Sequence, residues 1–259
     1  MDGIYKEIDQ KLVILSNERI ADGVYKMILE GDTSLITAPG QFINIKVPGF
    51  YLRRPISICD YDASGLTIIY KVVGNGTKDL SSMKAGDSLM CLMGLGNGFD
   101  VSAMGDDVLL VGGGVGTPPM YGLAKKLLAM GKAVTVVLGF NSYSDVFYTS
   151  EFEELEASVK DGSLELRVAT VDGSVGTAGF VTNCLEGTED ITDYAACGPI
   201  PMLKALYGYF EGKAPGQLSF EERMGCGFGA CVGCSIKTKS GFKKVCKDGP
   251  VFFSSDIIF

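Results

Sequence analysis

The feature that most limits the fold of this chain is a group of four cysteines near its C-terminal end. They follow the spacing C-x4-C-x2-C-x11-C at Cys226, Cys231, Cys234 and Cys246. In a reducing compartment such a group is more typical of a metal site than of disulfides. The first three positions match the plant-type spacing for a [2Fe-2S] cluster, in which four thiolates hold two irons. The tail therefore predicts an iron-sulfur site.

Glycines separate these cysteines, at Gly225, Gly227, Gly229 and Gly233. Glycine lets a tight loop bring three sulfurs around one side of a cluster, and its N–H groups can donate hydrogen bonds to the cluster sulfurs. A structural zinc site is the alternative, although such sites usually show two separated C-x2-C pairs. The four other cysteines are expected to be buried apolar residues, with Cys197 kept open as a functional candidate.

The chain of 259 residues contains no histidine, which removes imidazole as a base or metal ligand. Hydride and electron transfer remain possible, because a bound cofactor performs the reaction. The formal net charge of −8 argues against a nucleic-acid partner. No stretch reaches the roughly 18 apolar residues that span a bilayer, and the first ten residues lack the order of a secretory signal. A cytoplasmic protein without membrane association is expected.

The first hundred residues consist of short apolar and β-branched runs broken by glycine and proline. Their alternation is clearest where Ile43, Ile45 and Val47 are separated by Asn44 and Lys46. Alternation of this kind predicts strands with one buried face and one solvent face. Recurring turn signals favour an antiparallel barrel, and residues 1–100 are predicted to form the first domain.

The pattern changes after Gly105, where a buried-strand run at 107–111 leads through a glycine loop into a helical repeat. The apolar face of that helix is formed by Met120, Leu123, Ala124, Leu127 and Leu128. Strands and helices then alternate, which predicts a doubly wound parallel sheet, an α/β nucleotide-binding domain at 101–215. Residues 216–259 are predicted to form a small C-terminal [2Fe-2S] unit.

A further helix is predicted to start at a capping box formed by Ser150 and Glu153 and to run to about Lys160. A later helix is expected from about Pro199 to Phe210, after a strand at 194–197.

Two arginines stand together in the predicted barrel, in the segment Arg53, Arg54, Pro55, Ile56 and Ser57. Planar guanidinium groups suit a diphosphate, and a serine hydroxyl can hydrogen-bond a ring nitrogen. A surface ion pair at the start of a strand explains the residue types equally well. A second segment offers a stacking surface and backbone donors, at Tyr70, Lys71, Val72, Gly76 and Thr77.

The glycine loop between strand and helix has the sequence GGGVGTPP, which places Gly112, Gly113, Gly114, Gly116 and Thr117 at a helix start. Free backbone N–H groups and the helix dipole favour phosphate there, although a tight turn without a ligand is the alternative. The loop departs from G-x-G-x-x-G, because Thr117 replaces the last glycine. After the next strand no Arg or Lys is present to meet a 2′-phosphate, and Asp145 can take a ribose hydroxyl, so NAD is favoured over NADP.

With these segments in order, the chain resembles the ferredoxin-reductase superfamily and, within it, the electron transfer subunits of type B dihydroorotate dehydrogenase. The likeness extends over nearly the whole chain. It is carried by RRPIS at 53–57, YKVVGNGT at 70–77, LGNGF at 95–99, GGGVGTPP at 112–119, CGP at 197–199 and EERMGCGFGACVGC at 221–234. Ile56 departs from the wider superfamily, in which an aromatic residue often stacks on the flavin.

The resemblance implies that Arg54 contacts the FAD diphosphate and that Ser57 lies near the flavin N5. The segment 70–72 with Gly76 and Thr77 would complete the FAD site. The glycine loop and Cys197 would line the nicotinamide nucleotide site, so that Ser57 and Cys197 are the candidate catalytic residues.

The resemblance also implies that electrons enter singly through the cluster from a partner's flavin and leave from FAD to NAD+ as hydride. The partner would be an FMN-containing dihydroorotate dehydrogenase catalytic subunit, in a heterotetramer of two plus two chains. Two alternatives are a subunit of a bifurcating ferredoxin:NADP oxidoreductase or sulfhydrogenase, and a zinc-stabilised nucleotide-binding regulator.

Overall fold

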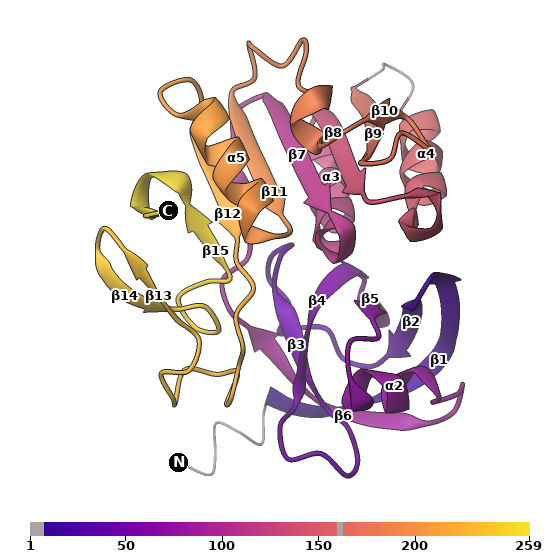
Figure 1. Cartoon of the computed structure of the whole chain (residues 1–259). Helices are drawn as coiled ribbons and strands as arrows, with labels where there is room; N and C mark the ends of the chain where they lie inside the picture. The colour runs from indigo at the N-terminus through magenta and orange to yellow at the C-terminus, as the bar shows by residue number, and fades with distance from the viewer. Residues whose placement is uncertain (1–7, 160–162) are drawn as a thin grey trace.

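The computed structural model describes residues 8–159 and 163–259. Its N-terminal part is a closed barrel of six antiparallel strands in the order β1-β2-β5-β4-β3-β6 (Figure 1). The strands are β1 (Asp9–Ala21), β2 (Val24–Glu30), β3 (Phe42–Lys46), β4 (Arg54–Tyr61), β5 (Gly65–Lys71) and β6 (Ser88–Leu95). A short helix, α2 (Asn75–Ser81), lies between β5 and β6. The predicted antiparallel barrel is confirmed.

The alternation in β3 places Ile43, Ile45 and Val47 in the barrel core, as predicted. The opposite face of β3 differs from the prediction. Lys46 is exposed, but Asn44 is only 1% exposed. Another part of the chain therefore covers the outer face of this strand.

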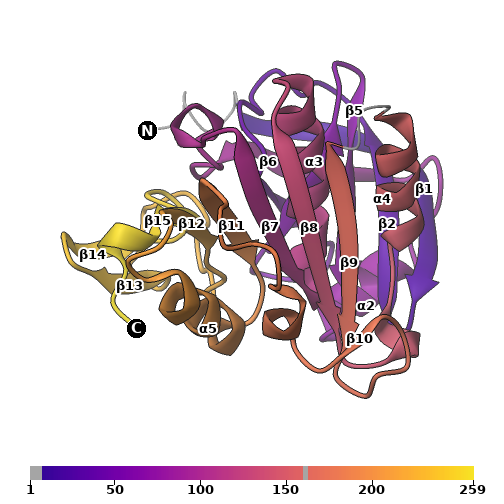
Figure 2. The same ribbon diagram turned by 90° about the horizontal axis from the view of Figure 1, so that it is seen from above.

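The second part is a seven-stranded sheet in the order β10-β9-β8-β7-β11-β12-β15, parallel except for its β12–β15 pair. Its strands are β7 (Asp107–Gly113), β8 (Ala133–Phe140), β9 (Leu164–Thr170), β10 (Thr177–Ala178), β11 (Asp193–Cys197), β12 (Gly216–Ser219) and β15 (Val251–Phe253). Helices α3 (Thr117–Ala129) and α4 (Thr149–Ser158) lie on one side of the sheet and α5 (Ile200–Phe210) on the other (Figure 2). The predicted doubly wound sheet is confirmed.

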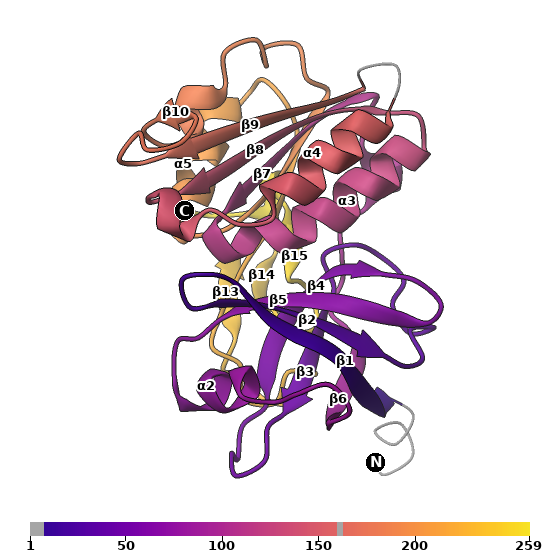
Figure 3. The same ribbon diagram turned by 90° about the vertical axis from the view of Figure 1, so that its right-hand side faces the viewer.

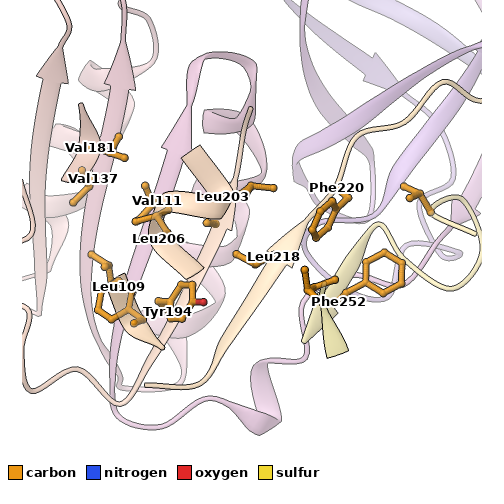
Figure 4. Close-up of a cluster of buried hydrophobic side chains, with 14 of the residues drawn as sticks. Leu109, Val111, Val137, Val181, Tyr194, Leu203, Leu206, Leu218, Phe220 and Phe252 are labelled. Carbon is orange, nitrogen blue, oxygen red and sulfur yellow. The ribbon is translucent and has the colours of Figure 1, made fainter. Parts of the chain in front are cut away.

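Each face of this sheet has its own apolar core. Val108 and Leu110 pack with the apolar face of α3, whereas Leu109 and Val111 pack with Leu203 of α5 and its neighbours (Figure 4). Successive side chains of a strand point to opposite faces, so a fully apolar strand such as β7 is suited to the centre of a sheet covered on both sides.

The last part of the chain is divided between two structures. Strands β13 (Ser235–Thr238) and β14 (Gly241–Lys244) form a separate hairpin, and the loop that carries three of the four tail cysteines precedes it. The strands β12 and β15, which the predicted unit 216–259 contained, instead extend the large sheet. The four residues of β12 are buried, and a Cβ at Gly216 would stand 2.2 Å from the Tyr194 ring, so this segment fits closely beside β11.

The barrel and the α/β part contact each other through α3, α4 and the barrel strands β2 and β4 (Figure 3). Lys26 of β2 pairs with Glu151 of α4 at 3.1 Å, and Lys125 of α3 pairs with Asp60 of β4. These ion pairs cross between the two parts of the molecule. No helix within residues 8–159 and 163–259 is long and apolar enough to cross a membrane.

The predicted capping box of α4 is wrong. The helix begins at Thr149, after Tyr148 in a left-handed conformation (φ 64°), and Ser150 lies inside its first turn. The Tyr148 ring, directly before the helix, packs edge-on against Tyr121 and Phe152. The predicted helix end at Lys160 lies outside the described residues.

Candidate redox site

The four tail cysteines form two pairs of interacting thiols, Cys226 with Cys231 and Cys234 with Cys246. The backbone N–H of Cys231 donates to the Cys226 Sγ at 3.4 Å, and the N–H of Cys246 donates to the Cys234 Sγ at 3.5 Å. A third donor, the Gly229 N–H, lies 3.2 Å from the Cys246 Sγ. Two pairs of thiols fit a [2Fe-2S] cluster, because each of its irons takes two protein ligands. Backbone donors aimed at ligand sulfurs are a further feature of such sites.

The thiols of this group differ in their acidity. Burial opposes ionisation of Cys226, but backbone N–H donors, that of Cys231 foremost, outweigh it and lower its pKa to about 6. Burial and the neighbouring Cys234 thiol raise the pKa of Cys246 to about 12. The loop therefore stabilises at least one thiolate, the form that binds iron. Within the described residues, no group of three or more His, Cys, Asp or Glu side chains is arranged to hold a single metal ion.

Arg54, the predicted contact of the FAD diphosphate, lies beside an aromatic ring and a glycine turn. Its guanidinium stacks over the Phe50 ring at 4.8 Å, and its Nη1 donates to the Leu52 carbonyl at 2.5 Å. A Cβ at Gly76 would stand 2.3 Å from the Arg54 Nε, so a side chain at this position would displace the guanidinium from the start of α2. A guanidinium fixed beside a glycine turn is suited to a diphosphate.

Arg53 points away from Arg54, because neighbouring residues of an extended strand face opposite sides. Its guanidinium forms a two-pronged ion pair with the Asp9 carboxylate at 3.0 and 2.9 Å. The structure therefore brings one of the two predicted arginines, not both, to the candidate anion site. The interpretation as an ion pair, left open by the sequence, applies to Arg53.

The stacking surface expected from Tyr70 is not available. The ring is 2% exposed inside the barrel, and its hydroxyl donates to the Asn17 Oδ1 at 2.9 Å. Thr77 accepts hydrogen bonds from the backbone of the preceding turn. Ile56 packs against the barrel core. The main chain of 70–77, rather than an aromatic ring, is what this segment can offer a cofactor.

The glycine loop packs against the turn that follows β11. A Cβ at Gly116 would stand 2.0 Å from the Cys197 carbonyl oxygen, and a Cβ at Gly113 would stand 2.6 Å from the Met202 sulfur. Gly112 and Gly113 end β7, and Gly114 begins the 3-10 turn before α3. The predicted nucleotide residues thus meet at the C-terminal edge of the parallel sheet, the usual ligand site of such folds.

Two side chains at this edge have properties that suit a bound nucleotide. The Thr117 hydroxyl is buried and has no hydrogen-bond partner among the described residues, as expected when a ligand supplies the partner. Burial raises the pKa of the Cys197 thiol to about 12, even though the Ser219 hydroxyl hydrogen-bonds it. Cys197 is therefore a neutral thiol, suited to contact with an uncharged ring and not to nucleophilic attack.

Asp145, the candidate partner of the nucleotide ribose, lies in the 3-10 turn (Tyr143–Asp145) after β8. Its Oδ1 is 3.5 Å from the Lys71 Nζ at the end of β5. The structure thus joins a residue predicted for the flavin site to one predicted for the nucleotide site.

Sequence reasoning missed one residue that touches the candidate cluster loop. The Asn44 Nδ2 donates to the Cys226 carbonyl oxygen at 3.3 Å. The alternation of β3 had placed Asn44 on the solvent face, and no local pattern links two residues 182 positions apart.

Comparison with known proteins agrees with this geometry. Residues 221–258 match the model of the iron-sulfur cluster binding domain of dihydroorotate dehydrogenase B, which sets the zinc alternative aside, and residues 110–207 match the oxidoreductase NAD-binding domain. A solved chain from a study of flavin-based electron bifurcation, in the NADH-dependent reduced ferredoxin-NADP oxidoreductase, has a TM-score of 0.83 and 29% identity. That match covers 95% of this chain and 89% of the other. The FAD/NAD binding domain of a Vibrio cholerae nitric oxide dioxygenase shares the fold, with a TM-score of 0.68 and 21% identity over 81% of this chain and 98% of the other.

A barrel of this type followed by a nucleotide-binding sheet and an iron-sulfur loop defines a ferredoxin-reductase-like oxidoreductase subunit. Curated relatives make the assignment narrower. The electron transfer subunits of dihydroorotate dehydrogenase B (NAD+) from Bacillus pumilus and Lysinibacillus sphaericus are 46% and 44% identical, and each match covers at least 94% of this chain and 96% of the relative. The chain belongs to this family of electron transfer subunits.

Proposed function

We propose that this chain is the electron-transfer half of an NAD-linked dihydroorotate dehydrogenase, in which dihydroorotate is oxidised to orotate for pyrimidine biosynthesis. It is an oxidoreductase subunit whose cofactors are FAD, a [2Fe-2S] cluster and NAD. The observation that carries the proposal is the pairing of four thiols, three of them in a loop that contacts the barrel.

The proposed function assigns the residues to three sites, one for FAD, one for the [2Fe-2S] cluster and one for the nicotinamide nucleotide. Arg54 beside Gly76 would hold the FAD diphosphate, Ser57 would lie at the reacting edge of the flavin, and Cys226, Cys231, Cys234 and Cys246 would hold the cluster. When bound, FAD exchanges electron pairs with a nicotinamide as hydride and single electrons with the cluster. The glycine loop and Cys197 would position the nicotinamide. The hydride step needs no side-chain acid, which agrees with the absence of histidine.

The names of the relatives describe electron transfer subunits, which supports a separate catalytic subunit as the partner. We propose that this partner contains FMN and the dihydroorotate site, that two copies of each chain assemble, and that the complex is cytoplasmic. We further propose the division into an FAD domain at 1–100, an NAD domain at 101–215 and a cluster subdomain at 216–259, with β12 and β15 completing the NAD-domain sheet.

The experiment that tests the proposal separates the two electron carriers. In Cys231→Ser, reduction of FAD by NADH should persist, while electron passage to the catalytic subunit is lost. Cys184→Ser, at a cysteine buried in the apolar core far along the chain from the tail, serves as the matched control and should retain both activities. Equal loss of both activities in Cys231→Ser would refute the division of labour.

A second candidate function has one specific observation in its favour. The solved chain with a TM-score of 0.83 comes from a study of flavin-based bifurcation. A subunit of a bifurcating ferredoxin:NADP oxidoreductase or a sulfhydrogenase would share this layout. Steady-state reduction of a dye by NADH and by NADPH tests the second candidate, because a strong preference for NADPH would contradict an NAD-linked dihydroorotate dehydrogenase and favour the ferredoxin:NADP oxidoreductase.

A further inference from the structure

We propose that Asn44 is a positioning residue that holds the cluster loop against the FAD barrel and thereby sets the reduction potential of the cluster and its electron exchange with FAD. The inference rests on the proposed function, because it assumes that the four thiols carry a [2Fe-2S] cluster. It adds a residue from the barrel to a site that is otherwise formed by the C-terminal tail.

The first support is the contact itself. Asn44 lies on β3, and its Nδ2 donates to the carbonyl oxygen of Cys226 at 3.3 Å. Cys226 is the first of the four predicted ligands, so the bond fixes the main chain at the point where the cluster loop begins. Asn44 is 1% exposed, and water does not compete for this bond.

The loop is shaped to accept this side chain. A Cβ at Gly227 would stand 2.2 Å from the Asn44 Nδ2 and 3.1 Å from its Cγ. Gly227 also has a φ of +80°, a conformation that residues with a side chain rarely adopt. The amide of Asn44 therefore occupies the space that a side chain at 227 would need.

The strand that carries Asn44 also borders the candidate flavin site. In the β3–β4 pair, Asn44 stands directly opposite Pro55, and Phe42 stands directly opposite Ser57. Directly opposite residues of an antiparallel pair share one face, with Cβ atoms about 5 Å apart. Ser57 and Asn44 therefore lie on the same outer face of β3 and β4, in neighbouring cross-strand pairs on that face.

Packing extends this contact beyond one hydrogen bond. Phe42 belongs to the same buried apolar cluster as Cys234 and Cys246, and Cys226 packs against that cluster. In Figure 1 the segment that leads into the cluster loop runs beside β3. Phe42 supplies apolar contact, and Asn44 adds a directional bond that apolar contact cannot give.

Burying the side-chain amide of Asn44 lowers the stability of the fold unless hydrogen bonds offset the loss of water. Its Oδ1 is buried and accepts no hydrogen bond within the described residues. An unpartnered buried carbonyl oxygen is unfavourable, and an apolar residue at this position would avoid the cost. The one side-chain hydrogen bond that this amide makes within the described residues is the bond to the Cys226 carbonyl oxygen, which is the role that we propose for it.

The test compares Asn44→Leu and Asn44→Ala in the complete protein with wild type, using Lys46→Ala as the matched control on the same strand face. FAD, iron and sulfide contents are measured first. The reduced cluster is then titrated by EPR to obtain its line shape and midpoint potential. Stopped-flow mixing with NADH follows flavin bleaching and cluster reduction separately.

We expect both Asn44 variants to retain FAD and the rate of flavin bleaching by NADH. The midpoint potential and the EPR line shape should shift, because the bond from the Asn44 Nδ2 to the Cys226 carbonyl oxygen no longer holds the main chain that places the Cys226 sulfur and the neighbouring N–H donors. Cluster reduction through FAD should slow by about fivefold, the factor that corresponds to one typical hydrogen bond. Loss of iron at unchanged FAD content would also support an anchoring role. Lys46→Ala should match wild type.

The inference is overturned when the Asn44 variants keep the wild-type potential, line shape and rate of cluster reduction. A loss of FAD together with iron would also overturn it, since Asn44 would then serve the fold of the barrel. Failure of the proposed function looks different, because wild type itself would then show no iron-sulfur signal.

Discussion

The Lys71 Nζ lies 3.5 Å from the Asp145 Oδ1, which links the end of a barrel strand to the loop after the second strand of the parallel sheet. Their side chains are 43% and 26% exposed, so the pair adds little to the free energy of folding. Its effect is on position. It holds the carboxylate proposed to meet the nucleotide ribose against the barrel.

Replacing Asp145 by Asn tests the nucleotide preference. A carboxylate accepts ribose hydroxyls and repels a 2′-phosphate, so Asp145→Asn should raise the KM for NADH and narrow the preference for NADH over NADPH. A tenfold narrowing corresponds to about 1.4 kcal/mol, the scale of one hydrogen bond to a charged group. Steady-state diaphorase kinetics with both nucleotides provide the measurement.

Lys71→Gln is the matched control for this prediction, because it breaks the same ion pair and keeps the carboxylate. The preference for NADH over NADPH should change less in Lys71→Gln than in Asp145→Asn, because the carboxylate is displaced but not removed. If both variants change the preference equally, the ion pair rather than the carboxylate is responsible, and the ribose contact is refuted.

Substitutions of the neighbouring residues Arg54 and Arg53 are expected to affect the FAD affinity differently. Arg54→Gln removes the guanidinium proposed for the FAD diphosphate, and charge-assisted hydrogen bonds of about 1.5–3 kcal/mol correspond to a loss of FAD affinity of about 10- to 150-fold. Arg53→Gln breaks the pair with Asp9 and should leave FAD affinity within about twofold of wild type. Titration of the deflavinated protein with FAD, followed by flavin fluorescence, measures both. A larger effect from Arg53 would contradict the assignment.

The barrel core predicts a decline of stability at alkaline pH. Burial raises the pKa of the Cys91 thiol to about 12, above its unfolded value of 9.0. The stabilisation is therefore complete below pH 9 and is lost as the pH rises from 9 toward 12, since only the unfolded chain ionises there. At pH 10 one such thiol lowers the free energy of unfolding by about 1.4 kcal/mol relative to pH 8.

Urea titrations at pH 8 and pH 10 measure this effect, with Cys91→Val as the comparison because valine keeps the volume and cannot ionise. Between pH 8 and pH 10, the free energy of unfolding should fall by about 1.4 kcal/mol less in Cys91→Val than in wild type. An identical decline in both proteins would show that Cys91 does not ionise on unfolding in this range.

Much of the fold follows from local patterns in the sequence. Turn signals and alternation predicted the barrel, the apolar run before the glycine loop predicted β7 within two residues, and the helical repeat after the loop predicted the buried face of α3. The cysteine spacing predicted that four thiols share one site, and three of them lie in a single loop because most ligands of such a cluster are encoded close together in the chain. These features depend on neighbours within a turn, a strand or a short loop.

Contacts between distant segments could not be predicted in this way. Two adjacent arginines gave no sign that Arg53 turns to Asp9, and Tyr70 was expected at the cofactor although its ring fills the barrel. Asn44 had the polar character of a solvent face, yet a loop nearly two hundred residues later covers it. In each case the partner comes from tertiary packing, which overrides the local pattern.

The most direct test of the account is an EPR spectrum of the purified protein after reduction with NADH and, separately, with dithionite. The account predicts a rhombic or axial signal of a reduced [2Fe-2S] cluster in both samples, with two irons per chain by metal analysis. No iron-sulfur signal in the dithionite sample, with zinc at one per chain and no iron, would contradict it.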